Sequence, residues 1–236
     1  MKYVIGIVVI LTLAFIVSSL GSDKDSSMKM DAPKEVSEMM DEGDMTSEKS
    51  SFSDGEYVIN VEASKVNWAG KKPLVEGYIN SGTLALSAGT VSVLDGSAVG
   101  EFSIDMNSLS VFETPKKPGK ESMLQEHLKG EGWFDVEAYP SATFSIKNVQ
   151  ARADSDSTFV YDVTGDLTMK GETHELVFPA QVYVDESGLL HADASLEFDR
   201  TLWGITAGSG NFFDNLADNV VDDMVALSFS LVAEKQ

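Results

Sequence analysis

The side chains that could carry out chemistry are few and lie far apart in the chain. The three histidines, His127, His174 and His191, have no second histidine or carboxylate at the spacing that zinc sites use. The chain contains no cysteine, which removes thiolate metal ligands and cysteine nucleophiles, and it lacks the G-x-S-x-G elbow that presents a catalytic serine. It also lacks a glycine-rich loop ahead of a helix, which a nucleotide site would need. These residues predict no enzyme, no metal site and no cofactor.

The remaining polar groups of interest lie near the end of the chain. Arg200, one of only two arginines, stands in FDRTLW directly after the most regular alternating segment, 189–199. An arginine there can pair with a buried carboxylate or receive the head group of a ligand, and both roles stay open. Acidic residues gather in 212–223, FFDNLADNVVDD, without the spacing of an EF-hand loop. We therefore expect a solvated acidic turn there rather than a Ca²⁺ site.

The overall charge excludes one class of partner. The 236-residue chain has a formal net charge of −21, and 43% of its residues are hydrophobic. Such a chain cannot neutralise a run of phosphates, so we expect no nucleic-acid partner. An anionic membrane surface would also repel the folded part. The apolar content is sufficient for a globular core.

The first 21 residues have the pattern of an export signal. Lys2 precedes an uncharged apolar run, 3–20, and Ser19-Leu20-Gly21 offers small residues for a cleavage site. The run is about 18 residues long, which is also the threshold length for a membrane-spanning helix. Residues 1–21 are therefore predicted to be either a cleaved signal peptide or an uncleaved anchor. Both alternatives predict an extracytoplasmic protein, periplasmic or secreted, that contacts the membrane only through this segment if it is retained.

Residues 22–53 are predicted to form a disordered, acidic linker rich in serine and methionine. They contain hardly any aromatic or β-branched residue and cannot bury enough apolar surface to offset the entropy of ordering. Soft Cu(I) could bind a group of methionines, but no histidine or cysteine accompanies these. We interpret them as part of a flexible tether.

From residue 54 to residue 236, apolar and polar residues alternate with the period of a β-strand. In 101–106, Phe102, Ile104 and Met106 would face one side of a sheet and the polar residues the other. Turn residues separate the alternating segments, as at Asp95-Gly96. Strands are predicted at 56–62, 64–70, 77–87, 89–94 with 97–106, 141–151, 158–168, 174–184, 189–199 and 223–233, with further turns at 154–156 and 186–188.

These segments predict an all-β domain over 54–236. Each has one apolar and one polar face, which is typical of antiparallel sheets. The segment 56–70 can be one bent strand or two. Roughly eight antiparallel strands in one chain favour a closed barrel, because closure removes exposed edges and leaves a lumen for one ligand. A two-sheet sandwich is the competing architecture.

The stretch Met123–Phe144 interrupts the strands. It begins as an amphipathic helix, breaks at two glycines and gathers Trp133, Phe134 and Tyr139 before a strand that starts after Pro140. We expect this single short helix to cover one end of the barrel, while Trp133 and Phe134 anchor the connection and Phe144 returns into the wall.

Several long motifs carry a resemblance to a known family. They are FSIDMNSL at 102–109, HLKGEGWFDVEAYPSATF at 127–144, VTGDLTMKGETHEL at 163–176, and FDRTLWGI with GSGNFFDNLADN at 198–219. From about Asn67 to Glu234 the chain resembles the YceI-like proteins of lipocalin-like, polyisoprenoid-binding type. It departs from the family pattern at Trp133-Phe134, where two phenylalanines tend to stand, and at Val75-Glu76, near which a histidine is common.

The resemblance implies an exported barrel whose lumen binds or carries a long-chain isoprenoid or a similar amphiphilic lipid. The alternative is a structural or stress-protective envelope protein with a packed, ligand-free interior. The residues expected to face the lumen are Trp68, Phe102, Ile104, Leu124, Phe134, Phe144, Leu196, Phe198 and Trp203. Burying a chain of methylenes supplies about 0.8 kcal/mol each and needs few polar groups.

Overall fold

The structure is a computed structural model that describes residues 52–152 and 160–236. Within these ranges it contains nine strands, one α-helix and two 3₁₀ turns, Arg200–Trp203 and Ala217–Asn219. The main elements are β1 (Gly55–Ile59), β2 (Lys65–Lys71), β3 (Ile79–Leu94), β4 (Ser97–Glu113), α1 (Glu121–Lys129), β5 (Ser141–Ala151), β6 (Val160–Met169), β7 (Glu172–Val184), β8 (Leu190–Asp199) and β9 (Met224–Lys235).

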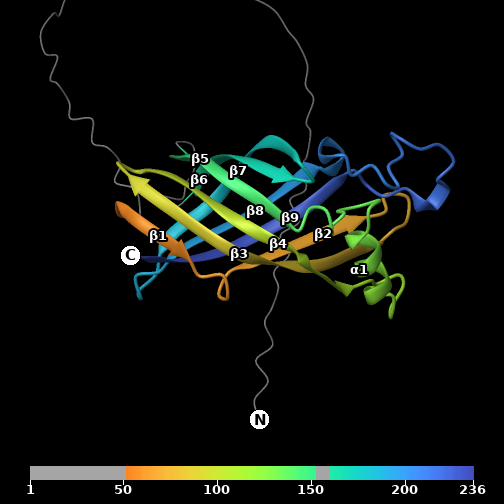
Figure 1. Ribbon diagram of the computed structural model, residues 1–236, viewed down its shortest axis with the longest axis horizontal. Coiled ribbons are helices and arrows are strands. Elements are labelled where there is room, and N and C mark those ends of the chain that lie inside the picture. The colour runs from red at the N-terminus through yellow and green to blue at the C-terminus, as the bar shows by residue number, and fades with distance from the viewer. Residues whose placement is uncertain (1–51, 153–159) are drawn as a thin grey trace, which may run out of the picture. The chain divides into compact units, whose positions relative to one another are not determined.

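The strands form one antiparallel sheet that closes into a barrel (Figure 1). β1 and β2 both pair with β3 on one side and with β9 on the other, so the two short strands share one position in the barrel. From β9 the order runs through β8, β7, β6 and β5 to β4, and β4 pairs with β3 to complete the circle. The predicted eight-stranded antiparallel barrel is confirmed, and the two-sheet sandwich is not formed.

The predicted division between 77–87 and 89–94 is wrong, because β3 runs unbroken through both segments. Its pairing with β4 shifts register between Thr83 and Ala85 and again between Leu86 and Ala88. Each irregularity resets the alternation of faces, so the sequence pattern resembles a strand end. The adjoining strand also continues beyond the predicted residue 106, to Glu113.

The predicted facing of the strands is confirmed where the alternation is strongest. Phe102, Ile104 and Met106 on β4 are each only 3% exposed, and Ala142 and Phe144 on β5 are buried as well. The Asp95-Gly96 turn joins β3 to β4 with positive φ at both residues, 51° and 78°. This backbone suits a two-residue hairpin, because its twist matches that of the strands.

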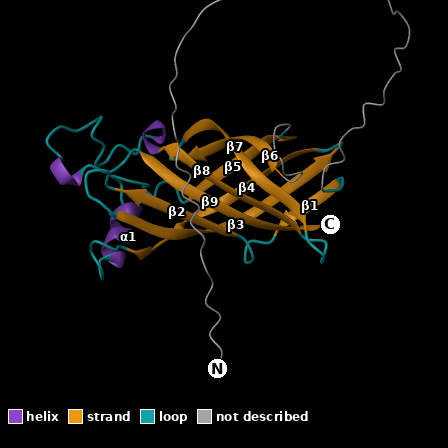
Figure 2. Ribbon diagram, turned by 180° about the vertical axis from the view of Figure 1, so that it is seen from behind, coloured by secondary structure: helices purple, strands orange, loops and turns teal. Residues whose placement is uncertain are grey.

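Helix α1 and the longest loops gather at one end of the barrel (Figure 2). Leu128 is the buried residue of α1, and it packs with Leu109 and Val111 of β4. Two hydrogen bonds fix the helix: Thr114 Oγ1 donates to Glu121 Oε1 (2.6 Å), and the backbone N–H of Val111 donates to Gln125 Oε1 (3.2 Å). The expected helix at a barrel end is therefore present. We call this the α1 end.

Three predictions concern residues outside the described ranges. They are the signal peptide or anchor at 1–21, nearly all of the linker at 22–53, and the turn at 154–156. Among the residues that are described, no helix is long and apolar enough to cross a membrane.

Candidate functional site

A cavity of about 800 Å³ occupies the half of the barrel nearest the α1 end. Inward-facing side chains of the strands form its apolar wall, and α1 and the loop after it contribute Leu124, Trp133 and Phe134. Pockets for small molecules are typically about 300–1,000 Å³ and mostly apolar. The cavity thus has the size and the lining of a ligand site.

The strand residues of this wall come from seven different strands. They are Trp68, Leu84, Ile104, Met106, Leu109, Ala142, Leu167, Met169, Phe198, Val225 and Leu227. Because alternate residues of each strand face the interior, one continuous apolar surface arises from segments far apart in the chain.

Four phenylalanines form a layer across the barrel beneath this cavity. Phe102, Phe144, Phe178 and Phe229 come from β4, β5, β7 and β9, and each ring lies against two others. The centroid distances around this phenylalanine layer are 5.4, 5.6, 6.5 and 5.6 Å. Such distances are typical of favourable aromatic pairs. A second, smaller apolar void of about 90 Å³ borders the layer.

Gly165 on β6 makes room for the layer. A Cβ atom there would lie 2.5 Å from Cζ of Phe144 and 2.7 Å from the carbonyl oxygen of Ser145. The backbone oxygen cannot give way, so only glycine lets the ring of Phe144 lie against the barrel wall. The register supports this, because Phe144 pairs with Leu167 and Ile146 pairs with Gly165 itself.

The structure separates the nine predicted lumen residues into three groups. Trp68, Ile104, Leu124, Phe134 and Phe198 line the large cavity. Phe102 and Phe144 belong to the phenylalanine layer and border the small void. Leu196 and Trp203 line neither space. Trp203 is fully buried and donates its indole N–H to the Leu167 carbonyl (3.1 Å). Whether the first group binds a ligand stays a prediction.

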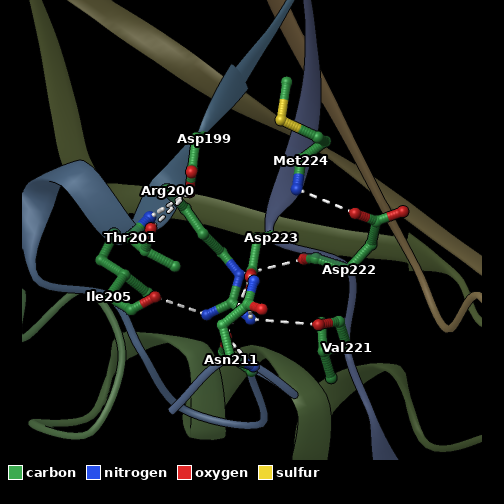
Figure 3. Close-up of polar contacts among 10 residues, drawn as sticks. Asp199, Arg200, Thr201, Ile205, Asn211, Val221, Asp222, Asp223 and Met224 are labelled. Atoms are coloured by element: carbon green, nitrogen blue, oxygen red, sulfur yellow. Dashed lines mark hydrogen bonds and ion pairs between the residues drawn. The ribbon is translucent and has the colours of Figure 1, made fainter.

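Arg200 borders the cavity but directs its polar contacts into the loop 205–223 (Figure 3). Its side chain is 1% exposed. It donates to the backbone carbonyls of Ile205, Val221 and Asp222 and forms an ion pair with Asp223 Oδ1 (3.3 Å). Its guanidinium also lies over the ring of Trp133, 5.1 Å from the centroid. Burial lowers the pKa of Arg200, and the nearby carboxylates oppose that shift.

The second carboxylate oxygen of Asp223 completes this connection. It accepts hydrogen bonds from Ser209 Oγ (2.9 Å) and from Asn211 Nδ2 (2.7 Å). The Arg200–Asp223 pair therefore ties the acidic stretch 212–223 to the barrel. In residues 52–152 and 160–236, no three His, Asp or Glu side chains come together as a metal ion would require.

Sequence reasoning missed the lysines around the cavity. Lys71, Lys72, Lys117 and Lys120 all border it, from the β2–β3 and β4–α1 connections. The only signal was the local density of lysine at 71–72 and 116–120 in a chain of strongly negative charge. No single residue there stood out, because the two segments meet only in the folded barrel.

The fold and the cavity together define the class of this protein, a closed antiparallel β-barrel with an apolar internal site. Residues 57–233 match the model of the YceI-like domain. The chain belongs to that family, and the resemblance seen in its motifs is confirmed.

The chain is also similar to a curated protein and to solved structures. A UPF0312 protein of Pseudomonas putida is 27% identical over 124 residues, which is 49% of this chain and 59% of that protein. Burkholderia cenocepacia BcnA is 25% identical, with a TM-score of 0.56 over 75% of this chain and 99% of that one. A domain from Saccharophagus degradans, described as polyisoprenoid-binding and implicated in plant cell wall breakdown, is 20% identical. Its TM-score is 0.56, over 76% of this chain and 98% of that one.

Proposed function

We propose that this protein binds or carries a long-chain isoprenoid or similar amphiphilic lipid, with the apolar chain inside the large cavity. The observation that supports this most directly is an apolar space of about 800 Å³ at one end of a barrel whose other end is packed. The description of the Saccharophagus degradans domain as polyisoprenoid-binding points in the same direction. We further propose that the barrel works outside the cytoplasm, as its N-terminal segment predicts.

The energetics suit binding more than catalysis. Each methylene that leaves water contributes about 0.8 kcal/mol, so ten buried carbons contribute about 8 kcal/mol before the entropy of association is subtracted. Affinity of this kind needs only apolar contact and a few polar groups at the entrance. The strand side chains that form most of the cavity wall provide that contact.

The first experiment tests whether the purified protein contains a lipid. The full chain would be extracted with organic solvent and the extract examined by mass spectrometry. In parallel, the protein would be titrated with a fluorescent isoprenoid. We expect a bound lipid or saturable uptake of the probe. The absence of both would refute the proposal and favour the alternative, a ligand-free envelope protein.

A pair of matched variants tests whether the probe binds in the cavity. Val225 lines the cavity from β9, and Val99 is exposed on β4. Val225→Phe puts a large ring into the empty space, so we expect it to weaken uptake of the probe at least about tenfold. Val99→Phe makes the same change on the outer face and should leave uptake unchanged. Equal binding by both variants would show that the probe binds elsewhere.

A further inference from the structure

The lining of the cavity differs in charge from the rest of the protein. The whole chain has a formal net charge of −21. Around the entrance to the cavity, however, stand Lys71, Lys72, Lys117 and Lys120, against the carboxylates of Glu126 and Asp222. Lysines thus outnumber carboxylates among the residues that line the cavity.

Three of these lysines have no carboxylate partner among the residues that the structure describes. Lys71 forms an ion pair with Asp222 (3.3 Å), whereas Lys72, Lys117 and Lys120 form none. Lys72 Nζ instead donates to the side-chain oxygen of Asn219 (3.1 Å) and lies 5.1 Å from the centre of the Tyr78 ring.

Glu121, the first acidic residue on α1, already accepts hydrogen bonds within its own connection. Glu121 Oε1 accepts hydrogen bonds from Thr114 Oγ1 (2.6 Å) and from the backbone N–H of Gly119 (3.2 Å). These hydrogen bonds fix the connection between β4 and α1, and Glu121 forms no ion pair with Lys117 or Lys120 among the described residues. Lys117 and Lys120 stay exposed on the cavity side of the same loop.

The two connections bring like charges close together. The pKa of Lys72 is lowered by burial and by the charge of Lys117, although Asp218 acts in the opposite direction. A bound anion would be attracted by both ammonium groups and would reduce the repulsion between them. The arrangement is therefore complementary to an anionic group at the end of an apolar chain.

We propose that Lys72, Lys117 and Lys120 receive an anionic head group, a phosphate or a carboxylate, whose apolar chain fills the cavity. This inference rests on the proposed function and adds the class of head group to it. Behind the lysines the wall becomes apolar within the same cavity, at Leu124 and Phe134. The site thus has a charged entrance and an apolar interior, which is the polarity of an acidic amphiphile.

The test compares two probes that share one chain, geranylgeraniol and geranylgeranyl phosphate. Affinities would be measured by titration calorimetry with the full-length wild type and with Lys72→Gln/Lys117→Gln. We expect the wild type to bind the phosphate ester about tenfold more tightly than the alcohol. The double variant should lose this preference and bind the alcohol as before.

Lys116→Gln is the matched control. Lys116 is the neighbour of Lys117 in the same exposed loop, but it does not line the cavity. Its substitution removes the same charge, so a general electrostatic effect would appear in it too. If Lys72→Gln disturbs folding, the comparison of Lys117→Gln with Lys116→Gln carries the test alone.

Each outcome has a definite meaning. If the wild type binds alcohol and ester equally, or if Lys116→Gln loses the preference as fully as Lys117→Gln, the head-group proposal is refuted and lipid binding stands. If neither probe binds, both proposals fail. Inorganic phosphate distinguishes the sources of the anion. If inorganic phosphate competes with the ester but not with the alcohol, the lysines accept a free anion. If it competes with neither, the head group must be attached to its chain.

Discussion

The phenylalanine layer should limit how long a chain the cavity accepts. Phe178 is 7% exposed, contacts both Phe144 and Phe229 in the layer, and borders the void of about 90 Å³ on the far side. We expect Phe178→Ala to leave an opening in the layer between that void and the large cavity. Affinity for a ligand longer than the present cavity should then rise.

The burial of the Phe178 ring sets both the expected loss of folding stability and the expected gain in affinity. Replacing a buried phenylalanine by alanine costs about 3–5 kcal/mol of folding stability. One more isoprene unit brings roughly five carbons, and their burial contributes up to about 4 kcal/mol. Part of that gain is lost in ordering the chain, so we expect at least about a tenfold increase in affinity for the longer ligand.

The assay measures the affinity of the wild type and of Phe178→Ala for a series of isoprenoid alcohols, each one isoprene unit longer than the last. In the wild type, affinity should increase with length and then level off where the chain meets the layer. In Phe178→Ala the plateau should begin about one unit later. Phe112→Ala, which removes an exposed ring from β4, serves as the control and should leave the series unchanged.

Stability is the main risk of this experiment. If Phe178→Ala does not fold, Phe178→Leu opens a smaller gap and removes fewer buried atoms, so it costs less folding stability. A folded variant with the chain-length series of the wild type would refute the view that the layer is the floor of the ligand site.

Three further predictions follow from contacts around the site. Gly165→Ala should destabilise the fold by more than about 1 kcal/mol in urea unfolding, because the new methyl group meets Phe144 and the Ser145 carbonyl. Gly132→Ala is the control and should cause no such loss, because a Cβ there has no neighbouring atom within 4 Å. Arg200→Gln should lower the free energy of unfolding by about 3 kcal/mol, since Asp223 and several carbonyls lose their donor. Lys147→Gln, which breaks exposed ion pairs, is the comparison. A smaller loss of stability in Arg200→Gln than in Lys147→Gln would contradict this. Asp185 has a lowered pKa because His191 and the backbone N–H groups of Leu189 and Ser187 donate to it.

The sign of the pH effect at Asp185 follows from linkage. Its pKa is lower in the folded state, so near the ordinary carboxyl pKa of about 4 the unfolded chain binds more protons. The stabilisation is therefore present above that value and is lost as the pH falls through the folded pKa. Asp185→Asn should be less stable than wild type near neutral pH and should lose less stability on acidification, as urea midpoints measured across this range will show. Parallel pH curves would refute this assignment.

The barrel could be predicted well from the sequence, because the patterns that indicate strands and turns lie within short segments of the chain. Alternation decides which face a residue occupies, and Asp95-Gly96 decides where the β3–β4 hairpin turns. Both act within one or two strands. Phe102 and Phe144 were accordingly expected inside, and they are buried there.

The depth of those residues along the barrel could not be predicted in the same way. It depends on register across strands that are distant in sequence: Phe102 lies opposite Phe144, while Phe178 and Phe229 complete the layer from β7 and β9. Alternation alone cannot distinguish a wall of the cavity from its floor. The lysines illustrate the same limit, because the net charge suggested repulsion of anions, whereas Lys72 and Lys117 come together only through folding.

The layer also reconciles the two readings of the interior that the sequence left open. One half of the barrel is packed, as a ligand-free structural protein would be, and the other half holds the cavity. Because the strands pair all around the circle, the backbone hydrogen bonds of the open half do not depend on what fills it. Stability and binding can therefore be changed separately: Val225→Phe should reduce binding with little effect on folding, and Asp185→Asn, at a residue that lines neither space, should lower stability without changing binding. Only a residue of the layer, such as Phe178, should change both at once.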